Sequence, residues 1–229
     1  MPISKSIYIV TDFETGSRNP YTTQPIEIAS IAVNPRTLEI VPNSEFVSLI
    51  KPLDDKEALD AGLDPIDDEA LKVNGKTREA LEKAPPIKSV WKQYMNYISN
   101  YNMSGREWDA PVMVGFNNNG FDDIIIDRIC TKKPWALGPV YEKRGCQGLF
   151  HPIVNIDIMK MAHPWFESNS DLKTISMDNL RAYFGMSFGG AHEALQDVKD
   201  EAEIFIRLMK LTRKFAQRVT FKDSFKINK

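Results

Sequence analysis

Four acidic residues and one histidine stand in sequence surroundings that suit metal-ion chemistry. Asp12 and Glu14 follow an apolar run, Asp122 opens a helical pattern, and His192 precedes Asp197 in the segment GGAHEALQDVKDEA. Carboxylates gathered in one pocket repel each other unless a cation holds them, and their hard oxygen atoms suit Mg²⁺ or Mn²⁺. Two such ions about 4 Å apart can polarise and cleave a phosphodiester. The order of these residues along the chain therefore predicts a nuclease.

The Asp12–Glu14 pair differs from other Asp-x-Glu pairs by its position after an apolar strand pattern. Residues two apart on a strand point to the same side, so both carboxylates can face one pair of metal ions. Similar pairs at 55–57 and 67–69 lie in an acidic segment and are better explained as solvated loop charges. About one such pair is expected by chance at this acid content, so the Asp12–Glu14 pair indicates a site only together with the other candidate acids and the histidine.

Asp122 and His192 each have a structural explanation beside the functional one. An acid in the first turn of a helix is favoured by the helix dipole by about 0.3–1 kcal/mol without any catalysis. Asp122 is the better site candidate than its neighbour Asp123, because it directly follows Phe121, which would anchor the helix start. Histidine is the side chain best suited to take a proton near neutral pH, and the two glycines before His192 would let it move.

Other polar residues are assigned structural roles. Asp157, in the segment NIDIMKMA, is interpreted as the cap of a following helix in preference to a member of the site. His151 and His163 lack comparable acidic neighbours, so we expect them to be structural or on the surface. The chain has no GxSxG, GxxxxGK[ST] or GxGxxG motif, which argues against serine-nucleophile, P-loop and Rossmann chemistry.

Length and composition indicate an ordinary globular protein. The 229 residues suit one large α/β domain, or at most two small ones. The formal net charge of −2 means that a nucleic-acid surface has to be a local patch. Two cysteines give no disulfide framework, and no apolar run is long enough to span a bilayer or to act as a signal peptide. We therefore expect a cytoplasmic protein with free thiols and no membrane partner.

Hydrophobic periodicity predicts the elements that must position these residues. Three strands in an antiparallel meander are expected first, followed by alternating helices and strands, which indicates a mixed sheet with helices on its faces. The candidate acids then fall at a strand end, a helix start and a first helical turn, and could converge at one edge of the sheet. The expected strands are 6–13, 25–33, 44–50, 110–117 and the start of 154–162; the expected helices are 87–101, 120–130, the end of 154–162, 174–185 and 192–215; short helical turns are expected in 54–70 and a long loop in 131–154.

The combined pattern resembles the histidine-bearing subgroup of the DEDD superfamily of 3′–5′ exonucleases, also called DnaQ-like. TDFETGS is similar to its first motif, GFNNNGFDD to its second and AHEALQDVKDEA to its third, with the His-x₄-Asp spacing. The resemblance runs from Ile7 to Leu211, and GFNNNGFDD and NIDIMKMA are most similar to the exonuclease I branch, which degrades single-stranded DNA. It implies a ribonuclease H-like fold, in which a mixed β-sheet is flanked by helices.

The resemblance also implies a catalytic centre with two Mg²⁺ ions, for which Mn²⁺ can substitute. Carried over position by position, Asp12, Glu14, Asp122 and Asp197 would be the metal ligands, and His192 would be the general base.

A second group of residues would contact the substrate. Thr15 and Gly16 would hold the terminal nucleotide through their backbone amides, with Phe13 nearby as a packing residue. Asn118 lies four residues before Asp122 and would support the substrate or the loop.

The resemblance divides the chain into an exonuclease domain, 1–212, and a basic C-terminal tail, 213–229. The last 20 residues, KLTRKFAQRVTFKDSFKINK, carry seven Lys or Arg against one acid. These basic residues could track phosphates, or they could simply be a solvated helix end.

We therefore expect a metal-dependent 3′–5′ exonuclease that hydrolyses single-stranded DNA to nucleoside 5′-monophosphates. An exoribonuclease of the same superfamily is the nearest alternative, because sugar preference depends on contacts to the 2′-position. A non-catalytic nucleic-acid-binding or replisome module is an alternative of another class. A proofreading subunit that serves a polymerase in trans, or another replication or repair partner, is a third.

Overall fold

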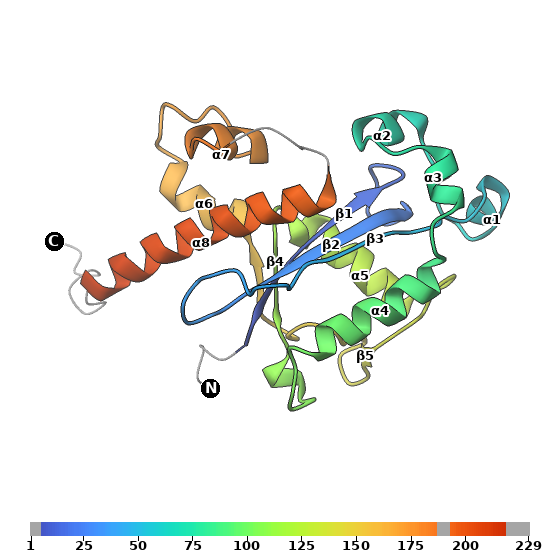
Figure 1. Ribbon diagram of the computed structural model, residues 1–229, viewed down its shortest axis with the longest axis horizontal. Coiled ribbons are helices and arrows are strands. Elements are labelled where there is room, and N and C mark those ends of the chain that lie inside the picture. The colour runs from blue at the N-terminus through green and yellow to red at the C-terminus, as the bar shows by residue number, and fades with distance from the viewer. Residues whose placement is uncertain (1–5, 187–192, 219–229) are drawn as a thin grey trace, which may run out of the picture.

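A five-stranded mixed sheet forms the centre of the fold. The computed structural model describes residues 6–186 and 193–218, and Figure 1 shows helices on both faces of the sheet. β1 pairs antiparallel with β2 and parallel with β4, while β2 pairs antiparallel with β3 and β4 pairs parallel with β7. In spatial order the strands are β3 (Phe46–Leu49), β2 (Pro25–Val33), β1 (Tyr8–Thr15), β4 (Val112–Gly115) and β7 (Asn155–Asp157).

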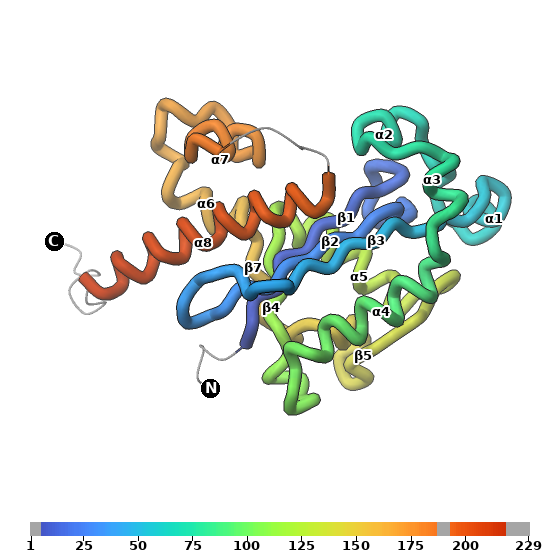
Figure 2. Tube along the Cα trace, viewed as in Figure 1, coloured from blue at the N-terminus to red at the C-terminus, as the bar shows by residue number. Residues whose placement is uncertain are grey.

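Helices cover the sheet on both sides and bury two hydrophobic clusters. α6, α7 and α8 pack over one face, whereas α4 and α5 pack over the other. The longest helix, α8, lies against β1 and β2, and it can be followed in red across the sheet in Figure 2. The helices are α1 (Asp55–Asp60), α2 (Asp68–Val73), α3 (Arg78–Glu82), α4 (Ile87–Ser99), η1 (Glu107–Asp109), η2 (Asn118–Gly120), α5 (Asp122–Thr131), α6 (Ile158–Phe166), α7 (Met177–Tyr183) and α8 (Ala194–Arg218).

The side-chain alternation of β1 decides which helix its acids can meet. Tyr8 and Val10 belong to the cluster beneath α8, while Ile9 between them belongs to the cluster beneath α4 and α5. Asp12 and Glu14 have the same parity as Tyr8 and Val10, so they lie on the α8 side of the sheet. The strand therefore presents two carboxylates to the beginning of α8.

Hydroxyl groups brace β1 from the opposite face. The hydroxyls of Thr11 on β1, Ser30 on β2 and Tyr94 on α4 lie within 2.9–3.0 Å of one another and are all buried. A closed set of hydrogen bonds leaves none of these buried groups without a partner, and it ties the strand that carries the acids to the helix beneath it.

The expected α/β class, a mixed sheet flanked by helices, is confirmed. The pairs at 55–57 and 67–69 are exposed, as expected, and they lie in or at the start of the helical turns expected in 54–70, where Asp54 and Asp67 accept hydrogen bonds as helix caps. The expected loop at 131–154 contains a short antiparallel hairpin, β5 (Val140–Tyr141) with β6 (Cys146–Gln147).

α8 continues to Arg218, past the proposed boundary at residue 212, which stays a prediction. None of the described helices combines the length and apolarity that a bilayer span needs.

Candidate active site

Three carboxylates from two elements meet at the end of β1. Asp12 and Glu14 on β1 and Asp197 in the first turn of α8 each offer an oxygen atom within 4.8 Å of the others. These side chains are far apart in the sequence and come together because α8 begins over the face on which the β1 acids lie. Clustered carboxylate oxygens at this spacing are the kind of donor set that divalent Mg²⁺ or Mn²⁺ prefers.

Asp122 contacts the same strand from the start of α5. It opens α5 and is buried, and its Oδ1 accepts a hydrogen bond from the backbone amide of Phe13 at 3.2 Å. Burial first, and then the charge of Asp12, raises the pKa of Asp122 well above its usual range. The carboxylate of Asp122 is thus an electrostatic neighbour of Asp12, and the start of α5 is tied to β1.

The acids repel one another strongly when no cation is present. Burial, followed by the charges of Asp197 and Glu27, raises the pKa of Asp12 to about 7. Burial, followed by the charges of Asp12 and Asp197, raises the pKa of Glu14 to about 8. In the absence of a cation both carboxyl groups therefore favour their protonated forms more than usual, so the cluster favours the arrival of positive charge.

Glu201 is a further acid of this cluster that the sequence motifs did not reveal. It lies one helical turn after Asp197 on α8, is buried, and its Oε2 has no hydrogen-bond partner among the described residues. Burial first, and then the charges of Asp12, Asp122 and Asp197, raises its pKa well above the usual range. The four-residue spacing from Asp197 was the available signal, because residues i and i+4 share one face of a helix.

Two basic residues partly neutralise the cluster, and neither was singled out in the sequence. The Nζ of Lys76 lies 2.7 Å from Glu27, which is the cross-strand partner of Glu14. Arg181 on α7 donates a hydrogen bond to Asp197. Because the acids outnumber these two cations, an excess of negative charge remains where a metal ion would bind.

The structure places the expected substrate-contact residues in varied settings. Phe13 is buried in the core beneath α4 and α5, which agrees with packing. Thr15 is also buried, and its hydroxyl donates to the carbonyl of Ser17 at 2.9 Å. The backbone amide of Gly16 donates to the carbonyl of Gln24 at 2.9 Å, so this amide is already engaged within the protein. The expected contacts of Thr15 and Gly16 with a nucleotide stay predictions.

Asn118 supports the loop that leads to Asp122. It is fully buried, and its Nδ2 donates to Asn155 Oδ1 at 2.7 Å and to the carbonyl of Ile156 at 3.3 Å. Since Asn155 and Ile156 belong to β7, Asn118 fixes the turn before α5 to the edge of the sheet. Of the two roles expected for it, these contacts favour support of the loop.

The histidines and Asp157 are the remaining residues to which the sequence assigned a role. His192 lies outside the described residues, so its place at the site stays a prediction. His151 is buried and accepts from the backbone of Val154 at 3.0 Å, while His163 is exposed. Asp157 accepts from the backbone amides of the first turn of α6 as the cap of that helix, as expected.

More than half of the chain matches the model of a known protein family. Residues 9–127, just over half of the chain, match the family model RNase_T, described as exonuclease. The chain therefore belongs to this exonuclease family, within the DEDD superfamily.

Two curated relatives are similar to nearly the whole chain. They are the DNA polymerase III PolC-type proteins of Thermotoga petrophila (strain ATCC BAA-488 / DSM 13995 / JCM 10881 / RKU-1) and Thermotoga maritima (strain ATCC 43589 / DSM 3109 / JCM 10099 / NBRC 100826 / MSB8), each 24% identical over 207 residues. The match covers 90% of this chain and 12% of each relative, so the chain spans only a small part of their length.

Solved structures of low sequence identity share the ribonuclease H-like fold. Cell-death related nuclease 4 (CRN-4) has a TM-score of 0.66 at 15% identity, covering 91% of this chain and 65% of its own. E. coli exonuclease I in complex with a dT13 oligonucleotide has a TM-score of 0.66 at 16% identity, covering 93% and 43%. A 3′-exonuclease described for recognition of a histone mRNA stem-loop has a TM-score of 0.61 at 17% identity, covering 90% and 82%.

Proposed function

We propose that this member of the exonuclease family is a 3′–5′ exonuclease, which removes nucleotides from the 3′ end of single-stranded DNA and releases nucleoside 5′-monophosphates. The observation that carries the proposal is the meeting of carboxylates from β1 and α8, with Asp122 of α5 beside them. Such a cluster has no evident structural use, because buried like charges oppose folding. It suits a site that binds cations and the phosphodiester they act upon.

The donor set fits a pair of Mg²⁺ ions, with Mn²⁺ as a substitute. We assign Asp12, Glu14, Asp122 and Asp197 as the residues that would hold the ions, since all offer hard oxygen atoms and the pKa values of three are raised in part by one another. When bound, such ions supply Lewis-acid activation of water and stabilise the charge that develops on the leaving oxygen. The raised pKa values support this assignment, because bound cations would remove the repulsion.

The protein's own residues would orient the reaction. Asp12 and Glu14 are fixed on a central strand, and the bond from the Phe13 amide holds Asp122 against that strand. His192, assigned from the sequence alone, would take the proton of the attacking water as general base.

The substrate would be held beside these acids. Thr15 and Gly16 would hold the terminal nucleotide, with Phe13 packing behind them, and Asn118 would fix the loop that presents Asp122. The position of Thr15 and Gly16 directly after the β1 acids supports this assignment, because a nucleotide held there would place its phosphate near the metal ligands.

The preference for DNA is tested with matched oligonucleotides. Incubation of the protein with 5′-labelled single-stranded DNA and RNA of one sequence, in Mg²⁺, should shorten the DNA at least about tenfold faster, which corresponds to about 1.4 kcal/mol in the barrier. Faster shortening of RNA would instead establish the exoribonuclease alternative. Tight binding without shortening of either strand, by folded and metal-loaded protein, would leave a nucleic-acid-binding module as the better account.

Similarity to PolC-type polymerases favours a second role, proofreading for a polymerase in trans. The curated relatives carry that name, and their matched segment is a small part of each chain. A polymerase or another replication or repair protein is then the expected partner. Co-purification of a polymerase with the tagged Asp12→Asn variant, and faster removal of a mismatched 3′ nucleotide when that polymerase is added, would support the role. Mismatch removal that is the same with and without the polymerase would contradict it.

A further inference from the structure

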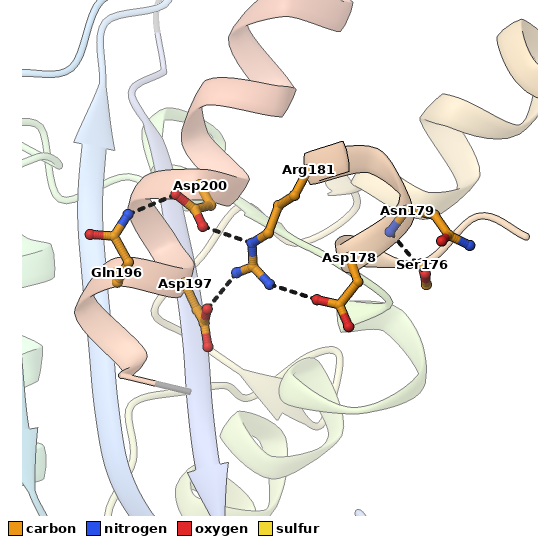
Figure 3. A network of polar contacts seen from close by, with 7 residues as sticks. All are labelled: Ser176, Asp178, Asn179, Arg181, Gln196, Asp197 and Asp200. Carbon is orange, nitrogen blue, oxygen red and sulfur yellow. Dashed lines mark hydrogen bonds and ion pairs between the residues drawn. The ribbon is translucent and has the colours of Figure 1, made fainter. Parts of the chain in front are cut away.

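Arg181 connects α7 to the acid cluster through two carboxylates of α8, the half-buried Asp197 and the buried Asp200. Its Nη2 donates to Asp197 Oδ1, and its Nε donates to Asp200 Oδ2 at 2.7 Å (Figure 3). The side chains of Arg181 and Asp200 are 5% and 9% exposed, so the ion pair between them is nearly shielded from water. A guanidinium offers its donors in a rigid plane, which allows one residue to fix two acceptors at once.

The contacts around the guanidinium leave it little freedom to move. On the inner side, Asp200 is itself held, because its Oδ1 accepts from Gln196 Nε2 at 2.7 Å. On the outer side, Asp178, which is 72% exposed, accepts from Nη1 at 3.2 Å. Figure 3 shows the guanidinium between α7 and α8 with these acids around it. Because the Arg181 guanidinium is itself held in place, it fixes the direction from which Asp197 is hydrogen-bonded.

We propose that Arg181 is a positioning residue for the metal site, which holds the Asp197 carboxylate in the orientation that divalent ions require. The inference rests on the proposed function, because it assumes that Asp197 is a metal ligand. Groups that hydrogen-bond to metal ligands fix the orientation of those ligands, and their removal commonly weakens metal binding about 10–100-fold. Asp200 serves the same purpose one step further out, by fixing Arg181.

A purely structural role for Arg181 makes a different prediction. Arg207 of α8 also joins α7 to α8, since its Nη1 donates to the carbonyl of Phe184 at 2.9 Å and its guanidinium lies 5.2 Å from the Phe184 ring. Its ion pair is with Glu203 on the exposed side of α8, so it is a matched control for the helix connection alone. If Arg181 only fastened α7 to α8, substitutions at the two arginines would have the same effect on metal binding.

The test is Mn²⁺ binding by the full chain, measured by titration calorimetry without substrate. Arg181→Lys keeps the charge but cannot span Asp197 and Asp200, so the Kd for Mn²⁺ should rise about tenfold. Arg207→Lys should leave this Kd within about twofold of the wild type, a difference that corresponds to roughly 0.4 kcal/mol. Melting temperatures of both variants report any loss of folding.

Several outcomes would overturn the inference or the proposed function on which it rests. If the Kd of Arg181→Lys equals the wild-type value, Arg181 is only a structural connection. The same conclusion follows if the Kd of Arg207→Lys rises as much as that of Arg181→Lys. Tighter Mn²⁺ binding by Arg181→Lys would mean that the arginine competes with the metal. Absence of Mn²⁺ binding by the folded wild type would instead contradict the proposed function and its metal site. If Arg181→Lys does not fold, Asp200→Asn replaces it, with a several-fold rise in Kd as the supporting result and an unchanged Kd as the contradicting one.

Discussion

Asp12 lies in a partly buried cluster of carboxylates, and its ionisation is costly in the metal-free protein. Burial and Asp197 raise the pKa of Asp12 from 3.8 to about 7. Between these pH values the folded state binds more protons than the unfolded state, so the free energy of unfolding falls as pH rises from about 4 to about 7. Glu14, with a pKa raised from 4.5 to about 8, extends this decline toward higher pH.

Removal of the Asp12 charge should raise the stability of the metal-free protein and abolish its activity. In EDTA at pH 8, Asp12→Asn should melt at a higher temperature than the wild type, by about 2–4 °C for each kcal/mol of repulsion relieved. Its melting temperature should also change less between pH 5 and pH 8, whereas metal-dependent turnover should fall below detection. Thermal melts across pH, with Asp60→Asn as an exposed-acid control, test this. A large drop in melting temperature would show that Asp12 is a structural residue.

At the scale of single elements, Asp157 illustrates an acid that serves the fold. Its Oδ1 accepts from the amides of Met159 and Lys160 at the start of α6, and from the amide of Asn117 at 3.1 Å. It therefore joins the end of β7, the first turn of α6 and the loop before Asp122. A helix cap of this kind is worth about 0.5–2 kcal/mol.

Asp157→Ala should lower the free energy of unfolding by about 1–2 kcal/mol, because it removes the cap and leaves backbone amides without their acceptor. Asp157→Asn keeps an acceptor oxygen and should lower it less. Both variants should keep the wild-type Kd for Mn²⁺. Urea unfolding and Mn²⁺ titration measure the two effects separately, and weaker Mn²⁺ binding by Asp157→Asn would make Asp157 a member of the site.

The sequence predicted the elements well because local patterns determine them. The apolar run of β1 indicates a strand, and the apolar stripe of α8 indicates a helix and the face that it buries; the cap at Asp157 also follows from local spacing. The short hairpin in 131–154 was missed, since each of its strands has only two residues and no periodicity can be detected at that length.

The prediction of the site was less complete, because it depends on contacts between distant segments. Asp12, Glu14 and Asp197 were predicted from motifs and do meet. Glu201 was overlooked because the inner face of α8 was identified from its apolar residues alone. Arg181 was overlooked because an arginine on a short helix is usually exposed, and only the packing of α7 against α8 buries it.

At the scale of the whole molecule, charge is distributed unevenly despite the formal net charge of −2. The acids of the candidate site lie where β1, α5 and α8 meet, and the last 20 residues carry seven Lys or Arg against one acid. Part of this basic segment belongs to α8, where Arg213 donates to the carbonyl of Pro35 at 2.6 Å. Binding of a nucleic-acid backbone away from the acids would use such basic residues.

Replacement of Lys222, Lys226 and Lys229 by serine should weaken binding of single-stranded DNA without changing kcat. For every lysine that neutralises a phosphate in the wild type, its replacement should reduce the slope of log affinity against log salt by about 0.7. Fluorescence anisotropy in the Asp12→Asn background measures binding without hydrolysis. The control is Lys88→Ser with Lys92→Ser, on the exposed side of α4. An unchanged salt slope would show that the tail lysines do not bind phosphate.

The proposed activity requires that the acid cluster is a metal-dependent centre that shortens nucleic acid from the 3′ end. The most direct measurement follows a 5′-labelled single-stranded DNA on a gel, with wild type and Asp12→Asn, in Mg²⁺ and in EDTA. We expect a ladder that shortens from the 3′ end only with the wild type in Mg²⁺. Shortening that persists in EDTA or in Asp12→Asn, or none by folded wild type in Mg²⁺, would contradict the proposed activity.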